Sequence, residues 1–205
     1  MRKAQIKRKT NEVDIKGNFV VDGEGKTKLN TSFEPLNHLL TLFAFHGLFD
    51  LDLAAEGDLQ HHIIEDIGIA LGKAFKEALG DKSGINRYGS FSATMDKVVV
   101  EANVDISGRP SLHREITAAN KVGVDTILDS GTFDDTSFTA KHAEEFLEAF
   151  TQHGGLSLVY NIKSGEGDLH HILEALFKAM GKALDQATQI DPRRKGIPST
   201  KGIID

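Results

Sequence analysis

Two segments of this chain carry histidines and glutamates in the same order. One reads EGDLQHHIIEDIGIALGKAF and the other reads EGDLHHILEALFKAMGKAL, so each contains the pattern HHxxE. The residues of the two motifs are His61, His62, Glu65, His170, His171 and Glu174. The histidine pairs lie 170 − 61 = 109 positions apart in 205 residues. Because imidazole and carboxylate groups bind divalent transition metals, the pattern predicts a metal-binding element that was duplicated with half of the chain.

The period of a helix separates the potential ligands of each motif. On a helix, His61 and Glu65 (i and i+4) share a face and can bind one cation together, whereas His62 is rotated by roughly 100°. The second motif behaves in the same way. Each metal could then take a His/Glu pair from one helix and the spare histidine from the other. A histidine at a helix start can also cap the helix or lie on the surface, but duplication of the whole context disfavours that interpretation.

The helices expected before the two motifs contain further candidates. Without gaps, HLLTLFAFHGLFDL (from His38) aligns with EFLEAFTQHGGLSL at an offset of 107, which puts Glu145 in the place of His38. Both are candidate extra ligands. His46 and His153 each precede a glycine at an expected helix C-terminus, where a cation is favoured, so capping and a role in the site are both open. His142 could substitute for Glu145, although it fits a surface role better.

Hydrophobic periodicity predicts the same series of elements in each half: a β-rich segment, a helix, a strand and a motif helix. The expected strands lie at Ala4–Arg8, Val13–Val21, Phe49–Ala55, within Tyr88–Ile106 and at Leu156–Ile162, and the expected helices at Leu36–His46, His61–Leu79, Lys141–Gln152 and His170–Gln189. The fold class is therefore α+β, with two homologous half-domains (1–95 and 96–190) and a helical bundle layered between two β-sheets. The polar, basic tail at 191–205 predicts a loop or arm.

Composition narrows the class of protein and of metal site. With 40% hydrophobic and 26% charged residues, the chain is typical of a globular protein. It has no run of about 18 apolar residues, so we expect no membrane span, and a net charge of −6 argues against nucleic acid as the main partner. We expect a cytoplasmic location. With no cysteine, any metal must be held by nitrogen and oxygen, which suits Mn, Fe, Co, Ni or Zn.

Several basic and hydroxyl side chains stand in loops rich in glycine or proline. They are Arg87, Arg109, Ser199, Thr200 and Lys201. Arginine can grip a phosphate with two hydrogen bonds, and serine, threonine and lysine can bind its remaining oxygens. Taken singly, each fits a solvated loop residue equally well. Together they predict a phosphate-binding site.

These motifs together resemble the imidazoleglycerol-phosphate dehydratase family of histidine biosynthesis. The resemblance runs essentially end to end. It includes RxTxE (Arg8, Thr10, Glu12), NHLL followed by FAFHG, the first HHxxEDxGIxLG, GIxRYG around Arg87, Met95-Asp96, DISGRP, the second HHxxEAxFKA and IPSTKG. The paired HHxxE motifs together with DxSGRP and PSTKG are highly specific.

The resemblance implies a lyase that dehydrates imidazole glycerol phosphate to imidazole acetol phosphate. It implies two divalent metals, manganese, each held by three histidines and a glutamate. Carried over, one set would be His38, His61, Glu65 and His171, and the other His62, His170, Glu174 and residue 145. The implied substrate contacts are Glu12, His46, Arg87, Arg109, Ser199 and Lys201, with Glu12 as the acid/base group and Glu65 and Glu174 as further carboxylates of the catalytic site. The family assembles as trimers and then as 24-subunit shells whose sites are completed between subunits.

The chain departs from the family pattern at several positions near these motifs. Glu145 stands where many relatives have histidine, Asn37 where aspartate is usual, and Lys97 where glutamate is usual. These departures indicate a divergent member, and a non-catalytic or substrate-shifted paralogue that keeps the fold remains an alternative. A di-metal redox protein in a four-helix bundle is disfavoured because such proteins use Glu-x-x-His and contain no sheets.

Overall fold

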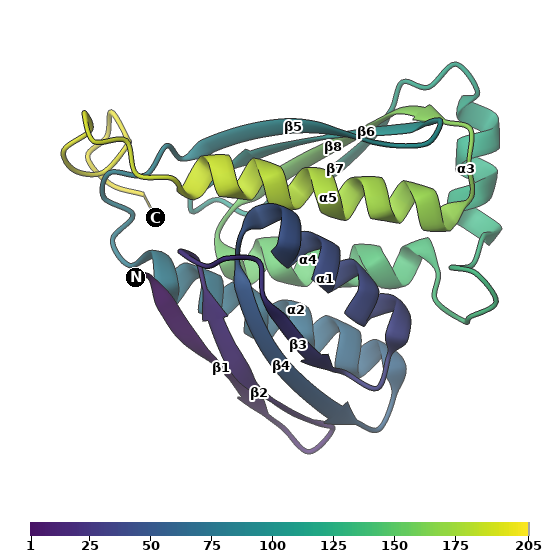
Figure 1. Cartoon of the computed structure of the whole chain (residues 1–205), viewed down its shortest axis with the longest axis horizontal. Helices are drawn as coiled ribbons and strands as arrows, with labels where there is room; N and C mark the ends of the chain where they lie inside the picture. The colour runs from purple at the N-terminus through teal and green to yellow at the C-terminus, as the bar shows by residue number, and fades with distance from the viewer. Residues whose placement is uncertain (205) are drawn as a thin grey trace.

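Two four-stranded sheets flank the long helices in the computed structural model, which describes residues 1–204 (Figure 1). The first sheet has the order β1 (Lys3–Lys9), β2 (Val13–Val20), β4 (Asp50–Gly57), β3 (Thr27–Asn30), and the second has β5 (Tyr88–Met95), β6 (Val98–Asp105), β8 (Ser157–Gly165), β7 (Ser111–Ile116). In each sheet the first two pairings are antiparallel and the last is parallel. The expected α+β fold of two repeated halves is confirmed.

Four helices fill the space between the sheets, and a fifth lies at one end. They are α1 (Glu34–Gly47), α2 (Gln60–Leu79), α4 (Ala140–Gly154) and α5 (Leu169–Thr188), with α3 (Lys121–Ser130) at the end. Each motif helix covers the sheet of its own half, α2 against β1 and β2 and α5 against β5 and β6. Each also packs on the preceding helix of the other half, α1 on α5 and α4 on α2. The halves are therefore interlocked.

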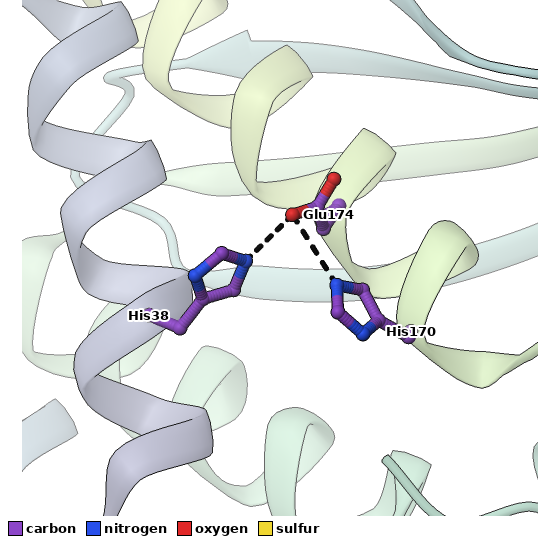
Figure 2. Close-up of side chains that lie close together, drawn as sticks. All are labelled: His38, His170 and Glu174. Atoms are coloured by element: carbon purple, nitrogen blue, oxygen red, sulfur yellow. Dashed lines mark hydrogen bonds and ion pairs between the residues drawn. The ribbon is translucent and has the colours of Figure 1, made fainter. Parts of the chain in front are cut away.

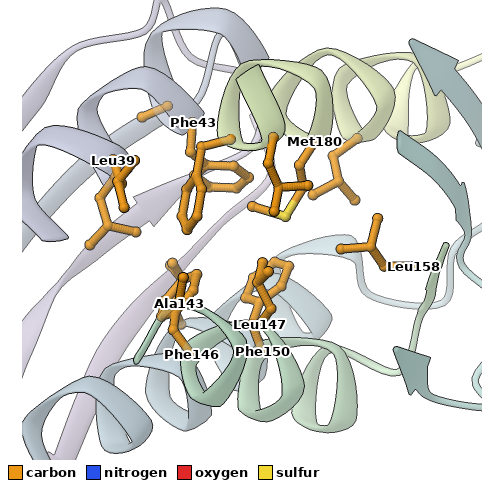
Figure 3. Packing of buried hydrophobic residues seen from close by; sticks show 14 of the residues in the cluster. Leu39, Phe43, Ala143, Phe146, Leu147, Phe150, Leu158 and Met180 are labelled. Carbon is orange, nitrogen blue, oxygen red and sulfur yellow. The ribbon is translucent and has the colours of Figure 1, made fainter. Parts of the chain in front are cut away.

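Apolar residues alternate with polar ones along the strands and recur with the helical period along the helices. The buried apolar side chains form one continuous core. In β1 and β2, Ile6, Ile15 and Phe19 face inward and are at most 1% exposed, while their neighbours face solvent. The aromatic rings of Phe43 on α1 and Phe150 on α4 lie 5.9 Å apart and join the two helix pairs. Figure 3 shows Leu39 and Phe43 on one side of this core and Phe146, Leu147 and Phe150 on the other.

Glycines allow the interlocked helices to approach closely. A Cβ atom on Gly72 of α2 would lie 2.9 Å from the backbone nitrogen of Gly154 on α4. A Cβ atom on Gly181 of α5 would lie 3.1 Å from the backbone nitrogen of Gly47 on α1 and 2.5 Å from the carbonyl oxygen of Phe43. Because 72 + 109 = 181, these contacts occupy equivalent positions in the two repeats. Backbone thus lies against backbone at both crossings.

Three elements escaped the sequence prediction, and one boundary was misplaced. The edge strands β3 and β7 are short and mostly polar, and α3 buries only Val124 and Leu128, so none carries a clear apolar period. Strand β5, which we assigned to the half at 1–95, pairs with β6 in the second sheet. The halves therefore divide before Tyr88 and not after Met95. The tail over 191–204 contains neither helix nor strand, as expected. No described helix is long and apolar enough to cross a membrane.

We predict that Gly181→Ala destabilises the protein by about 1–3 kcal/mol, since the added methyl group overpacks the α1–α5 crossing. Gly123→Ala on α3 is the matched control: its Cβ would lie 3.7 Å from the nearest atom, so it should be neutral or slightly stabilising. Thermal and denaturant unfolding of both variants measures the difference. Equal stability of Gly181→Ala and the parent would contradict the proposed close approach.

Candidate active site

The second motif and α1 form a cluster of potential ligands. Figure 2 shows His38 on α1 pointing toward His170 and Glu174 on α5. The Nε2 atom of His38 lies 2.6 Å from Oε1 of Glu174, and Nε2 of His170 lies 3.3 Å from the same oxygen. Within residues 1–204, this is the one group of three such side chains whose ligand atoms all lie within 4.8 Å. The i, i+4 spacing on α5 therefore places two groups on one face and α1 adds a third.

The carboxylate of Glu174 is ionised at neutral pH. The residue is 6% exposed. Burial raises the pKa of the Glu174 carboxyl, but hydrogen bonds from Lys178 Nζ, at 2.8 Å, and from His38 outweigh this effect and hold the pKa at about 2. One oxygen therefore faces the two histidines while the other is held by Lys178. Nitrogen donors around an ionised carboxylate fit a divalent transition metal.

The first motif lines a separate cavity of about 400 Å³. The potential ligands in its wall are His61 and Glu65 from α2 with Glu145, Glu148 and His153 from α4. The Oε2 atom of Glu145 is buried and has no hydrogen-bond partner among the described residues. Because an unsatisfied buried carboxylate oxygen is costly, this atom fits a bound cation. The cavity thus suits a metal by the chemistry of its donors.

The ligand sets carried over from the family resemblance need a correction in how they are grouped. We grouped His38 with His61 and Glu65, and residue 145 with the second motif. Within one chain, His38 instead contacts the second motif and Glu145 lines a cavity with the first. The cause is the interlocked packing, because α1 lies on α5 and α4 lies on α2.

The remaining histidine of each motif lies outside these clusters in a single chain. His62 Nδ1 is 2.8 Å from Asp58 Oδ1 and 4.0 Å from Glu12 Oε2. His171 Nδ1 is 2.6 Å from Asp168 Oδ1, and the same carboxylate caps the start of α5. Both side chains are partly exposed. The second histidine of each pair is thus held by an aspartate outside these clusters, and it is accessible to another group.

All five of the predicted phosphate-site residues line a third cavity, of about 470 Å³. They are Arg87, Arg109, Ser199, Thr200 and Lys201. Among the described residues, neither Arg109 nor Lys201 forms an ion pair, so both cations are available to an anion. The hydroxyl of Ser199 adds a hydrogen-bonding group. The sequence therefore identified side chains that the fold brings together from the loop before β5, the β6–β7 loop and the tail.

Arg87 lies in the wall of this cavity with its guanidinium already paired inside the protein. Its Nε and Nη2 atoms donate to both carboxylate oxygens of Asp105 at 2.7 and 3.0 Å, and its Nη1 donates to the carbonyl of Pro198 at 3.1 Å. The guanidinium is thus already engaged, and it fixes the tail beside Arg109. Asp105, which sequence reasoning did not single out, is its partner.

The other histidines can now be assigned. His142 belongs to a capping box, in which its Nδ1 accepts from the backbone of Thr139 at 3.1 Å. His113 is exposed on β7. Burial, and then the charges of Lys178 and Lys182 on α5, lower the pKa of His46, which favours its neutral form.

The phosphate-type cavity and the ligand cluster lie at opposite ends of α5. The tail and α3 mark these two ends in Figure 1. The backbone of Arg87 donates to the carbonyl of Ala187 in the last turn of α5 at 2.8 Å, whereas His170 is in the first turn. At 1.5 Å per residue, the 187 − 170 = 17 positions between them span about 25 Å. One small molecule cannot reach both in a single chain.

Comparisons with known proteins decide the family. A model described as imidazoleglycerol-phosphate dehydratase matches residues 31–184. The chain belongs to the imidazoleglycerol-phosphate dehydratase family. As a family member it is a hydro-lyase of histidine biosynthesis. The imidazoleglycerol-phosphate dehydratase of Pelobacter propionicus is 47% identical over 207 residues and covers 99% of both chains, and that of Thermoanaerobacter sp. strain X514 is 46% identical and covers 100% of both.

Solved structures of this dehydratase family have the same fold. The structure of the Staphylococcus aureus protein superposes with a TM-score of 0.76 at 32% identity and covers 92% of this chain and 99% of its own. The Pyrococcus furiosus protein, in complex with (S)-C348, gives a TM-score of 0.77 at 32% identity over 96% and 98%. The two sheets and interlocked helices are thus the fold of the dehydratase family.

We predict that Lys178→Met lowers the stability of the metal-free protein at neutral pH. We also predict that the stability of this variant falls less steeply than that of the parent as the pH is lowered. The pKa of Glu174 in the folded state, about 2, lies below the unfolded value of about 4.3. Its contribution to stability is therefore present above about pH 4.3 and is lost as the pH falls through about 2. Without Lys178 that pKa rises. Thermal unfolding of chelator-treated protein between pH 3 and 7 tests this, with Lys182→Met as the control; identical profiles for both variants would refute it.

Proposed function

We propose that this chain catalyses the metal-dependent dehydration of imidazole glycerol phosphate to imidazole acetol phosphate, in the cytoplasm. The observation that carries the proposal is the convergence of His38, His170 and Glu174 from two helices. Family membership supplies the substrate, since the relatives bear the name of this dehydratase. A small phosphorylated imidazole is the proposed ligand, and neither nucleic acid nor a membrane is a proposed partner.

Two centres would hold two divalent ions, for which the family resemblance suggests manganese. One consists of His38, His170 and Glu174, and the other of His61, Glu65 and Glu145. His62 and His171 would each complete a centre from another copy of the chain. When bound, the ions would supply Lewis acidity that lowers the pKa of the ring N–H of the substrate. With glutamate at position 145, the second centre is harder and more anionic than one with histidine there.

Side chains of the protein would bind the substrate and move its protons. Arg109, Ser199 and Lys201 would hold the phosphate, and Arg87 would keep the tail in place. Dehydration removes one hydrogen and one hydroxyl as water, so a group must take a proton and return one to the leaving hydroxyl. Glu12, exposed on the β1–β2 turn beside His62, is the proposed group.

The separation of the two regions in one chain supports a site shared between copies. About 25 Å along α5 divides the ligand cluster from the phosphate-type cavity. A homo-oligomer would bring the cluster of one copy to the cavity of another. We therefore propose the assembly that the family resemblance implies, with trimers that combine into a 24-subunit shell.

We expect the manganese-loaded protein to convert imidazole glycerol phosphate, followed through the absorbance of the enol/ketone product. His170→Ala should abolish turnover and remove metal from the centre of His38, and His61→Ala should do the same for the other centre, as measured by elemental analysis. Glu145→His should retain both metals. His113→Ala is the control, because that side chain lies outside both centres. A fully metallated assembly without turnover would point instead to a non-catalytic or substrate-shifted paralogue.

We also predict complementation between two inactive variants, His170→Ala and Lys201→Ala. After dissociation, mixing in equal amounts and reassembly, a shared site can draw its intact ligand cluster from one variant and its intact cavity from the other. Random assortment would restore about a quarter of the parental activity. Light scattering confirms that full-size assemblies have re-formed, and co-purification through an affinity tag on one variant confirms that they are mixed. Failure of well-formed mixed assemblies to recover activity would place both regions of each site in one copy.

A further inference from the structure

The two halves differ most in the connection that leads into the ligand-bearing helix. In the first half, residues 31–33 join β3 to α1. In the second half, residues 117–139 join β7 to α4 and include α3. The longer connection carries Phe133 and Asp134, and both contact His170 on α5. The connection at 31–33 in the first half is too short to contain an equivalent segment.

Asp134 and Phe133 hold the imidazole of His170 from two sides. The Nδ1 atom of His170 lies 2.9 and 3.0 Å from the two carboxylate oxygens of Asp134. The ring of Phe133 stacks on that of His170, with 4.2 Å between centroids and 16° between planes. In the neutral imidazole that binds a metal, a proton on Nδ1 donated to Asp134 leaves Nε2 unprotonated, and Nε2 is the atom that faces Glu174. The two contacts thus fix both the tautomer and the orientation needed for a metal ligand.

The connection is itself rigidly held. Phe133 is 4% exposed, and its backbone N–H donates to the carbonyl of Phe138 at 2.7 Å. Its own carbonyl accepts from the hydroxyl of Thr136 at 2.6 Å. Asp134 has a φ of 51°, in the left-handed region that Asp tolerates better than most residues. A backbone fixed in this conformation delivers the carboxylate to His170 at little further cost in entropy.

His61, the counterpart of His170, lacks such support in the chain. Among the described residues, no carboxylate forms an ion pair or hydrogen bond with His61, and its ring contact is with the neighbouring His62 at 4.2 Å. The side chain is exposed. His61 must therefore lose rotational freedom when it binds a metal, whereas His170 has already lost it.

We propose that Phe133 and Asp134 are positioning residues for His170, which make the centre of His38, His170 and Glu174 the tighter of the two metal sites and the first to fill. This inference rests on the two metal centres of the proposed function. Partners of this kind typically change metal affinity by roughly 10- to 100-fold. The connection at 117–139 would thereby determine which centre binds its metal ion first. The two repeated motifs alone would not determine that order.

Calorimetric titration of the assembled, chelator-treated protein with Mn²⁺ tests the order of filling. The parent should bind in a tight and a weaker phase. Asp134→Ala should weaken the tight phase roughly 10- to 100-fold and leave the other unchanged. The Mn²⁺ affinity of the tight phase in Asp134→Asn should lie between those of the parent and Asp134→Ala, because the amide oxygen of asparagine still accepts a hydrogen bond from Nδ1 of His170. Phe133→Leu should weaken the same phase. Asp135→Ala should leave both phases unchanged, because Asp135 is exposed and, among residues 1–204, forms no hydrogen bond or ion pair with His170.

Further measurements assign the phases and separate the possible failures. In a His61→Ala background only the centre of His38 remains, so the effect of Asp134→Ala should persist there, with a changed electron paramagnetic resonance spectrum of bound Mn²⁺ and an unchanged unfolding midpoint. Two equal phases in the parent, or an unaltered tight phase in Asp134→Ala, would overturn this inference alone. A parent that binds no Mn²⁺ would overturn the proposed function together with it.

Discussion

The contact of backbone with backbone at the two glycine crossings is the constraint on which the rest of the molecule depends. Gly72 against Gly154 and Gly181 against Gly47 bring each motif helix onto a helix of the other half. At a separation wide enough to hold side chains between the backbones, the phenylalanines between the helix pairs would lose their packing. The imidazole of His38 would then also lie beyond hydrogen-bond distance of Glu174. The close approach of the helices is therefore required both for the packing of the core and for bringing the potential ligands together.

The two proposed metal centres have similar ligand arrangements but differ in electrostatics. At the second motif, Lys178 binds one oxygen of Glu174 and adds a positive charge beside the cluster. At the first motif, the equivalent position (178 − 109 = 69) is occupied by Ile69, and Glu148 also lines the cavity. The first cavity is thus more anionic and the second cluster more nearly neutral. Two ions of the same element would experience different fields in the two places.

The sequence was sufficient wherever the geometry is local. Spacing of i and i+4 along one helix predicted that His170 and Glu174 share a face, and repeated periodicity predicted the layered fold. It could not pair His38 with the correct motif, because that pairing depends on which helices cross between distant halves. Nor could it find Asp134, since a polar loop residue carries no periodic signal and reaches His170 only through tertiary packing.

The repeated strand order and the two equivalent crossings also bear on the history of the chain. A half-length ancestor would have made both crossings with a second copy of itself, as a two-fold symmetric dimer in which every substitution appeared twice. A fused chain is free of that restriction. One half can carry His38 where the other carries Glu145, and one half can hold an arm over 117–139 that the other lacks. Two unlike clusters of potential ligands are therefore open to the fused chain and closed to a symmetric dimer of identical halves.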